Sequence, residues 1–120
     1  MANKCYRDLI VWQRSMILVE EIYAMSKSFP KDELYGLTSQ LRRSAISIPS
    51  NIAEGEGRKS ENEFKRFLYI AKGSLCELET QVIIAEKLNY LNSKQLNFIL
   101  SLSDEIGRLV SGLISSISKH

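Results

Sequence analysis

The chain has 120 residues, of which 44% are hydrophobic and 25% are charged. That length fits one domain spanning residues 1–120, and it allows enough buried surface for folding without disulfides or metals. The formal net charge of +2 is too small to indicate a nucleic-acid partner, so such a partner requires a local cluster of basic residues.

Cysteine and histidine are scarce. Cys5 and Cys76 are far apart in sequence, which indicates free thiols in a reducing compartment, and Cys76 falls in an apolar pattern typical of core packing. The only histidine is His120, so most histidine-based metal sites and catalytic triads are excluded. We therefore expect no cofactor. There is no signal peptide and no run long enough to span a bilayer, so a cytoplasmic location is expected.

The hydrophobic pattern is helical along the chain, and the first helical segment runs from about Asp8 to Ser26. The Asp8 carboxylate is placed to cap the first free amides. Twelve of the seventeen residues from Leu9 to Met25 are apolar. This is more than one bundle-facing stripe needs, so part of the helix should face another helix or another subunit.

The second segment begins between Asp32 and Thr38 and fades at Gly55 and Gly57. Its apolar stripe consists of Leu37, Leu41, Ala45, Ile48 and Ile52. Pro49 interrupts this helix, because proline lacks an amide proton and costs about 3 kcal/mol in a helix interior. The apolar spacing continues across Pro49, which predicts a kink rather than a break.

The third segment has the clearest start, since Ser60 and Glu63 form a capping box. Residues then recur at heptad spacing, in two rows that are apolar except for Asn89 at the end: Phe64, Ala71, Leu78 and Ala85, and Leu68, Leu75, Val82 and Asn89. Asn92 or Ser93 caps a fourth segment. Four helices with short links predict an all-α, antiparallel up-down-up-down four-helix bundle, with the second helix kinked at Pro49.

The stretch Gly55–Ser60 ends in Lys-Ser, as a phosphate-binding Walker loop does. Arg58 stands where that loop requires glycine, a helix rather than a strand precedes it, and Glu54 and Glu56 would repel phosphate. The stretch therefore indicates a helix end followed by a capped helix.

Polar side chains follow one face of the second helix, and Gly73, Glu77 and Gln81 recur by fours on the third, where Gly73 would let another backbone approach closely. We interpret these side chains as a hydrogen-bonded seam that fixes helix register, made of Arg43, Asn51, Glu54, Glu77 and Gln81. The alternative is a catalytic carboxylate pair, Glu54 and Glu77, which would need a pocket and separated pKa values.

Basic residues are the strongest functional signal. The candidates for contact with nucleic-acid phosphates are Arg42, Arg43, Arg58, Lys59, Lys65, Arg66 and Lys72. A solvated helix face is the alternative interpretation of the same charges. No aromatic residues are interleaved with them as in single-strand binders, and no helix-turn-helix or zinc-finger pattern is present.

Three stretches resemble a known family: LIVWQRSMILVEEIY, FPKDELYGLTSQLRRSAISIPSNIAEG and FKRFLYIAKGSLCELETQVIIAEKLNYL. They are similar to the four-helix bundle proteins encoded by 23S rRNA intervening sequences, a family similar in fold to the accessory variability proteins of diversity-generating retroelements. The resemblance covers about Asp8 to Leu91. The family's motif positions fall here on Trp12, Gln40, Arg42, Arg43, Asn51, Glu54 and Gly55.

The resemblance implies a homopentamer, with bundles arranged as a barrel, and a role with nucleic acid. This agrees with the surplus of apolar residues on the first helix. Together the patterns and the resemblance predict a non-enzymatic, oligomeric bundle that binds RNA or another nucleic acid through basic residues. The alternative is an assembly or adaptor protein that binds another protein and no nucleic acid. Nothing in the sequence indicates a membrane partner.

Overall fold

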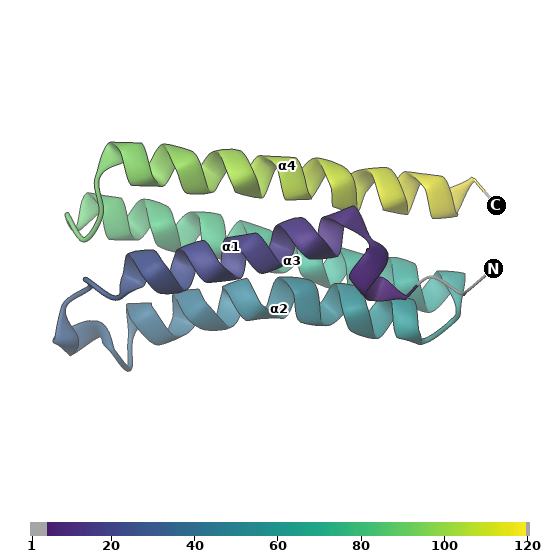
Figure 1. Cartoon of the computed structure of the whole chain (residues 1–120), viewed down its shortest axis with the longest axis horizontal. Coiled ribbons are helices and arrows are strands. Elements are labelled where there is room, and N and C mark those ends of the chain that lie inside the picture. The colour runs from purple at the N-terminus through teal and green to yellow at the C-terminus, as the bar shows by residue number, and fades with distance from the viewer. Residues whose placement is uncertain (1–4, 120) are drawn as a thin grey trace.

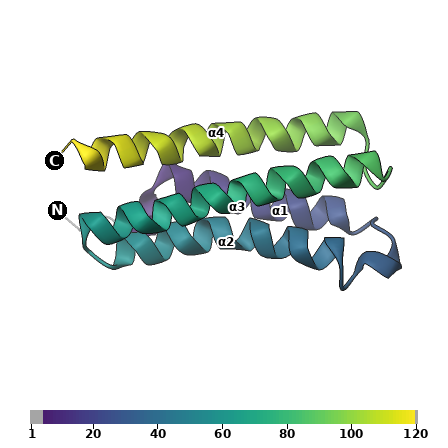
Figure 2. The same cartoon turned by 180° about the vertical axis from the view of Figure 1, so that it is seen from behind.

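A computed structural model describes residues 5–119 as four helices packed side by side (Figures 1 and 2). The helices are α1 (Ile10–Ser26), α2 (Leu37–Gly57), α3 (Glu61–Lys87) and α4 (Ser93–Ser118). Two short 3-10 turns, η1 (Tyr6–Asp8) and η2 (Lys31–Glu33), precede α1 and α2. The predicted all-α four-helix fold is confirmed, and the bundle measures 47 × 23 × 21 Å.

Successive helices run in alternating directions, as the colour along α1 to α4 shows (Figure 1). Each helix packs against two others: α1 and α3 each contact α2 and α4. The most extensive contact is between α2 and α3. The order of the helices along the chain is therefore also their order around the bundle, as short connections require.

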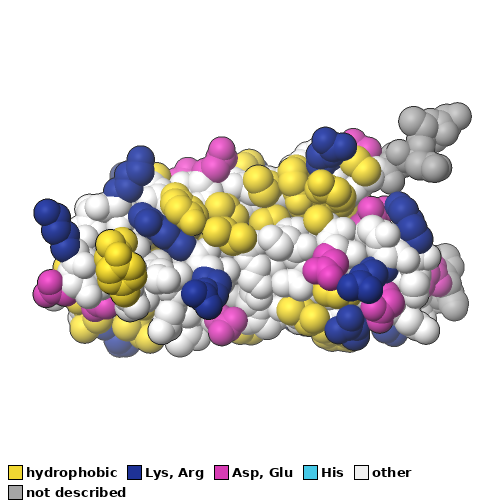
Figure 3. All heavy atoms as spheres, turned by 90° about the horizontal axis from the view of Figure 1, so that it is seen from below, with side chains coloured by type: hydrophobic (Ala, Val, Ile, Leu, Met, Phe, Trp, Pro, Cys, Tyr) yellow, Lys and Arg dark blue, Asp and Glu magenta, His cyan; other side chains and the backbone are white. Residues whose placement is uncertain are grey.

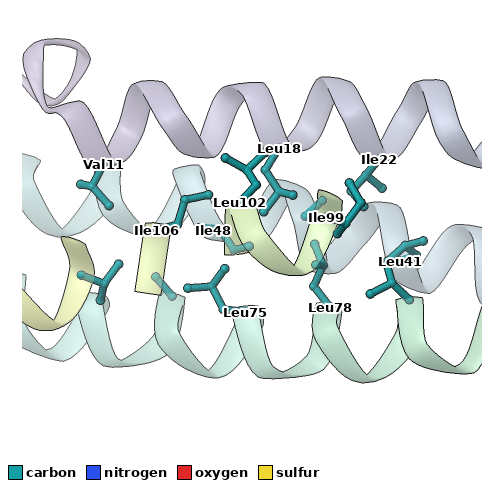
Figure 4. Packing of buried hydrophobic residues seen from close by; sticks show 14 of the residues in the cluster. Val11, Leu18, Ile22, Leu41, Ile48, Leu75, Leu78, Ile99, Leu102 and Ile106 are labelled. Carbon is teal, nitrogen blue, oxygen red and sulfur yellow. The ribbon is translucent and has the colours of Figure 1, made fainter. Parts of the chain in front are cut away.

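The core lies along the axis between the four helices (Figure 4). Each helix contributes side chains that are 0–1% exposed, among them Leu18, Ile48, Leu78 and Ile106. The heptad residues predicted on α3 form this buried row, with the exception of Phe64, which is half-buried, and Asn89, which is exposed. Hydrophobic burial of this row gives α3 its orientation.

The start of α1 differs from the sequence prediction. Leu9 occupies the N-cap position, and Asp8 ends η1 instead. The Asp8 carboxylate accepts a hydrogen bond from the Cys5 amide at 3.2 Å, so it satisfies the 3-10 turn and not the first turn of α1. The prediction of an Asp8 cap was wrong because the chain inserts this extra turn before the helix.

Helix α2 continues through Pro49 without interruption, and Pro49 is buried inside it. The kink at this residue stays a prediction. The helix ends at Gly57, and Lys59, two residues further on, adopts a left-handed conformation with a φ of 57°. The Lys59 amide donates to the Glu56 carbonyl at 3.2 Å, which satisfies one of the free carbonyls at the helix end.

The predicted caps of α3 and α4 are largely confirmed. Ser60 accepts from the Glu63 amide at 3.4 Å, although the Glu63 carboxylate pairs with Arg66 rather than reaching back. Asn92 caps α4 and forms a reciprocal pair of hydrogen bonds with Gln95. These bonds hold the short links that set each helix against its neighbour.

Two small residues on α3 differ from expectation. Cys76 is exposed and free, so it does not pack in the core. Gly73 is also exposed, and no atom lies within 4 Å of the position where a Cβ would stand, so no backbone approaches it. The close approach occurs at Gly55 on α2, where an added Cβ would stand 2.6 Å from the Cβ of Phe67. Within residues 5–119, no helix is long and apolar enough to cross a membrane.

Candidate nucleic-acid interface

Two shallow grooves meet at the N-terminal half of α2, and each encloses about 450 Å³. The apolar groove lies between α1 and α2 and is lined by Tyr23, Leu34, Tyr35, Thr38, Ser39, Arg42, Arg43 and Ile46. The polar groove lies between α2 and α3 and is lined by Tyr35, Ser39, Gln40, Arg43, Ser44, Ser47, Glu77 and Gln81. Tyr35, Ser39 and Arg43 border both grooves: Ser39 and Arg43 are four residues apart on one face of α2, and Tyr35 lies in the turn just before that helix.

The loop before α2 positions Tyr35, whose side chain is 94% exposed. Glu33 fixes this loop from both sides. One carboxylate oxygen accepts from the Tyr90 hydroxyl at 2.8 Å, and the other accepts from the Leu37 amide at the start of α2 at 3.2 Å. The bond to Glu33 also raises the pKa of Tyr90 above its ordinary value. The hydrogen bonds of Glu33 thus order the loop that exposes the ring of Tyr35 to solvent.

Arg42 is the more buried of the paired arginines and is held against α1. Its Nε donates to the Ser26 hydroxyl at 2.9 Å, and its guanidinium carbon lies 4.6 Å from the centre of the Tyr23 ring. These contacts fix the guanidinium by a hydrogen bond and a cation–π interaction, and they leave its charge without a carboxylate partner in residues 5–119.

Arg43 is exposed and borders both grooves. Among the described residues, no hydrogen bond or ion pair engages its guanidinium. It therefore leaves all five of its N–H donors free in grooves that the exposed Tyr35 also lines. Of the seven predicted phosphate contacts, Arg43 and Lys72 are exposed without an ion pair or hydrogen bond in the described residues, and of these two only Arg43 borders a groove with an aromatic residue.

The turn between α2 and α3 carries basic residues that are paired locally with acids. Arg58 bonds to Glu54 at 2.9 Å, Lys59 to Glu56 at 2.9 Å, and Arg66 to Glu63 at 3.1 Å. Hydrogen bonding from Arg66 lowers the pKa of Glu63 below its ordinary value. Ion pairs three or four residues apart neutralise these charges at short range, so the turn is less attractive to phosphate than its sequence suggests.

The remaining two candidates lie elsewhere. Lys65 donates to the Ser118 hydroxyl near the end of α4 at 3.2 Å. Lys72 borders a different groove, between α3 and α4, together with Cys76 and Arg108. The fold therefore does not gather the seven basic residues on one surface, and only Arg42 and Arg43 meet at a groove with aromatic walls.

Residues 7–112 match a protein-family model described as 23S rRNA-intervening sequence protein. The chain belongs to this family. Its structure is also similar to the crystal structure of a protein with unknown function of the S23 ribosomal protein family from Bacteroides thetaiotaomicron, with a TM-score of 0.81 and 26% sequence identity. The similarity covers 88% of this chain and 98% of that one. No curated protein sequence matches the chain.

In this 23S rRNA-intervening sequence family member, the polar contact between α2 and α3 involves fewer side chains than the predicted seam. The hydroxyls of Ser47 on α2 and Ser74 on α3 are hydrogen-bonded at 2.8 Å. Asn51 supports Ser47 from one turn along, and its Nδ2 donates to the Ser47 carbonyl at 2.8 Å and to its hydroxyl at 2.9 Å. Ser74 is the residue that the sequence prediction missed. The sequence did contain a signal for its burial, because Ser74 lies three residues after Ala71 and four before Leu78, on the buried face of α3.

The other predicted seam residues do not bridge helices within the described part of the chain. Glu54 pairs with Arg58 on its own helix, while Arg43 and Glu77 face the polar groove. Gln81 borders the same groove, and its Oε1 is buried without a hydrogen-bond partner. The two carboxylates of the alternative catalytic pair do not share a groove either, because Glu54 does not line the groove that Glu77 lines.

Proposed function

We propose that the protein is a non-enzymatic, cytoplasmic RNA-binding protein that acts as a homo-oligomer. The observation that carries the proposal is that Arg43 and Tyr35 both border the two grooves where they meet. An unpaired guanidinium attracts phosphate or a base edge, and an exposed tyrosine offers a face on which a base stacks. The name of the family, 23S rRNA-intervening sequence protein, points to RNA as the nucleic acid.

Unpaired bases are the form of RNA that this arrangement suits. Sequence-specific RNA recognition mostly targets single-stranded loops and ends, whose bases stack on aromatic rings or guanidinium planes. A double helix keeps its bases stacked inside, so Tyr35 would have no base face to contact. We therefore assign single-stranded RNA, or the loop of a folded RNA, to the surface around Arg43.

Charge pairing limits how strongly the binding depends on salt. Four of the seven predicted basic residues, Arg42, Arg43, Lys65 and Lys72, have no ion pair within residues 5–119. For single strands the logarithm of the binding constant falls by about 0.7 per neutralised phosphate for each tenfold rise in salt concentration. We expect a slope no steeper than about −3, whereas seven contacts would give about −5.

The oligomer forms, in our proposal, through a third groove between α1 and α2 that encloses about 320 Å³. Apolar side chains gather along the face where these helices meet (Figure 3). The groove is lined by Tyr6, Trp12, Met16, Val19, Ile46, Pro49, Ser50 and Ala53. Met16 and Ile46 are 38% and 42% exposed, and a second copy would cover them.

We propose a pentamer, as the sequence resemblance implies. Light scattering after size exclusion should then give about five times the chain mass of 13.7 kDa. The variant Met16→Glu should lower this mass, because it places a charge in an apolar contact. A monomer at micromolar concentration in the wild-type protein would rule out the oligomer and leave the RNA proposal to its own test.

The adaptor alternative rests on a different observation. The apolar groove exposes Leu34 at 48% and Tyr23 at 37%, and such side chains also suit a protein partner. In this alternative Arg43 would contact a protein and RNA would not bind.

RNA binding is tested by fluorescence anisotropy with a labelled single-stranded 12-nucleotide RNA, a hairpin with the same loop, and a blunt duplex, at two salt concentrations. We expect the single strand and the hairpin to bind at low salt and to weaken with the shallow slope given above, and the duplex to bind least. Absence of binding to every RNA at low salt, with the helical content and the oligomer intact, would reject the proposal in favour of the adaptor.

A further inference from the structure

The polar groove contains charged and hydrogen-bonding groups that the fold does not use. Arg43 on α2 and Glu77 on α3 border it from opposite helices, and neither forms an ion pair or hydrogen bond with residues 5–119. By contrast, the basic residues Arg58, Lys59 and Arg66 around the turn between α2 and α3 are paired with acids. The groove is therefore a place where a donor-rich and an acceptor-only group both lack a partner.

Gln81 adds an independent observation. Its Oε1 is buried and has no hydrogen-bond partner among the described residues. Buried polar atoms are satisfied in the great majority of protein structures, so this unsatisfied acceptor is an exception on the wall of the groove, although it is covered from solvent and does not itself face a ligand. Gln81 follows Glu77 by four residues, so the two side chains lie on the same face of α3.

The ligand must meet three requirements. It needs adjacent N–H donors for the Glu77 carboxylate, acceptors for the Arg43 guanidinium, and a flat face for the ring of Tyr35 at the border of the groove. The volume of about 450 Å³ lies within the usual range for small-molecule sites. A single flat heterocycle with donors on one edge and acceptors on the next satisfies all three.

Guanine is the RNA base with this arrangement. Its Watson–Crick edge carries two adjacent donors, N1–H and the N2 amino group, whereas adenine, cytosine and uracil each carry one donor beside acceptors. Its O6 and N7 accept a bidentate pair of hydrogen bonds from arginine. A carboxylate accepts two parallel bonds in the same way. Glu77 therefore discriminates among the bases, and Arg43 adds to that discrimination.

We infer that the polar groove binds a guanine base of single-stranded RNA, with Glu77 accepting from N1–H and N2–H, Arg43 donating to O6 and N7, and Tyr35 stacking on the ring. The inference rests on the proposed RNA-binding function and specifies the base that it selects. Tyr35 contributes affinity for any base, because stacking tolerates every sequence. Selectivity for guanine comes mainly from Glu77, with a further contribution from Arg43.

The test is fluorescence anisotropy of the full-length protein with three labelled 12-nucleotide RNAs: alternating U and G, alternating U and A, and U alone. We expect the wild type to prefer the U–G strand by about tenfold, since a good bidentate pair discriminates by about 1–3 kcal/mol. Glu77→Gln should reduce this preference to about twofold and leave the affinity for the U strand unchanged. Glu20→Gln, on the exposed face of α1, is the matched control and should keep the preference.

Two outcomes overturn the inference while leaving RNA binding in place: equal affinity of the wild type for all three strands, or a guanine preference that Glu77→Gln retains. If no strand binds at all, the proposed function has failed. Isothermal titration with guanosine and adenosine monophosphates then tests, separately from RNA binding, whether the polar groove binds guanine. Guanosine-selective binding that Glu77→Gln removes would support the groove as a guanine site, and absence of binding would overturn it.

Discussion

The hydroxyls of Ser47 on α2 and Ser74 on α3 lie 2.8 Å apart and form the polar link between the two helices that share the most extensive contact. Ser74 is 5% exposed, and Asn51 holds the Ser47 hydroxyl in place. Arg43 borders the polar groove one turn before Ser47 on the same face of α2. The link therefore fixes how α2 and α3 face each other beside the groove that we assign to RNA.

The losses in unfolding free energy from removing the Ser47 and Ser74 hydroxyls should not be additive. Ser74→Ala is expected to lower the free energy of unfolding by about 1–2 kcal/mol, because it leaves the Ser47 hydroxyl without its cross-helix partner. The double variant Ser47→Ala/Ser74→Ala should lose less than the sum of the single variants. Urea unfolding at fixed protein concentration measures this. Ser101→Ala on the exposed side of α4 is the control, and equal losses for Ser101→Ala and Ser74→Ala would refute the link.

The glycines of α2 and α3 should respond oppositely to alanine. Gly55→Ala is expected to destabilise the protein by about 1–3 kcal/mol, because its Cβ would stand 2.6 Å from the Cβ of Phe67 and force α2 away from α3. Gly73→Ala meets no neighbour within 4 Å and should stabilise the protein by up to about 1 kcal/mol through helix propensity. Thermal unfolding measures both variants. If Gly55→Ala and Gly73→Ala changed the melting temperature in the same direction, this packing would be contradicted.

Alkaline pH should loosen the loop that carries Tyr35. The hydrogen bond to Glu33 raises the pKa of Tyr90 in the folded state above its unfolded value. The stability that this bond supplies is therefore complete below the ordinary tyrosine pKa of about 10, and it is lost as pH rises through the folded pKa. Tyr90→Phe lacks the bond at every pH. We expect wild type and Tyr90→Phe to differ in urea midpoint at pH 8 and to converge above pH 10, and a constant difference across this range would argue against the contact.

The sequence predicts the architecture well because the local signals agree with one another. The α3 heptad residues and the capping side chains Ser60 and Asn92 follow from spacing, and the structure confirms the two caps and every heptad position except Phe64 and Asn89. The Asp8 cap failed because the chain inserts a 3-10 turn that the hydrophobic period does not encode. The prediction of a close backbone approach at Gly73 was also wrong, because a glycine in a helical pattern marks such an approach only if a neighbouring helix faces it.

The candidate site could be predicted only in part. Arg42 and Arg43 were named from the sequence, but the same reasoning gave equal weight to Arg58 and Arg66, whose charges are paired with acids one turn away. The importance of Tyr35 depends on the loop that exposes it and on the grooves that meet there. These depend on the packing of α1, α2 and α3, which separate segments of sequence do not reveal.

The central claim is that RNA binds at Arg43, and it is tested most directly by comparing Arg43→Ala with Arg66→Ala. The two variants remove the same charge, but Arg66 is paired with Glu63, whereas Arg43 borders both grooves. We predict that Arg43→Ala weakens the binding of a labelled single-stranded RNA by at least about fivefold at low salt, and that Arg66→Ala changes it by less than about twofold. Equal weakening by both variants, or a loss confined to Arg66→Ala, would contradict the account.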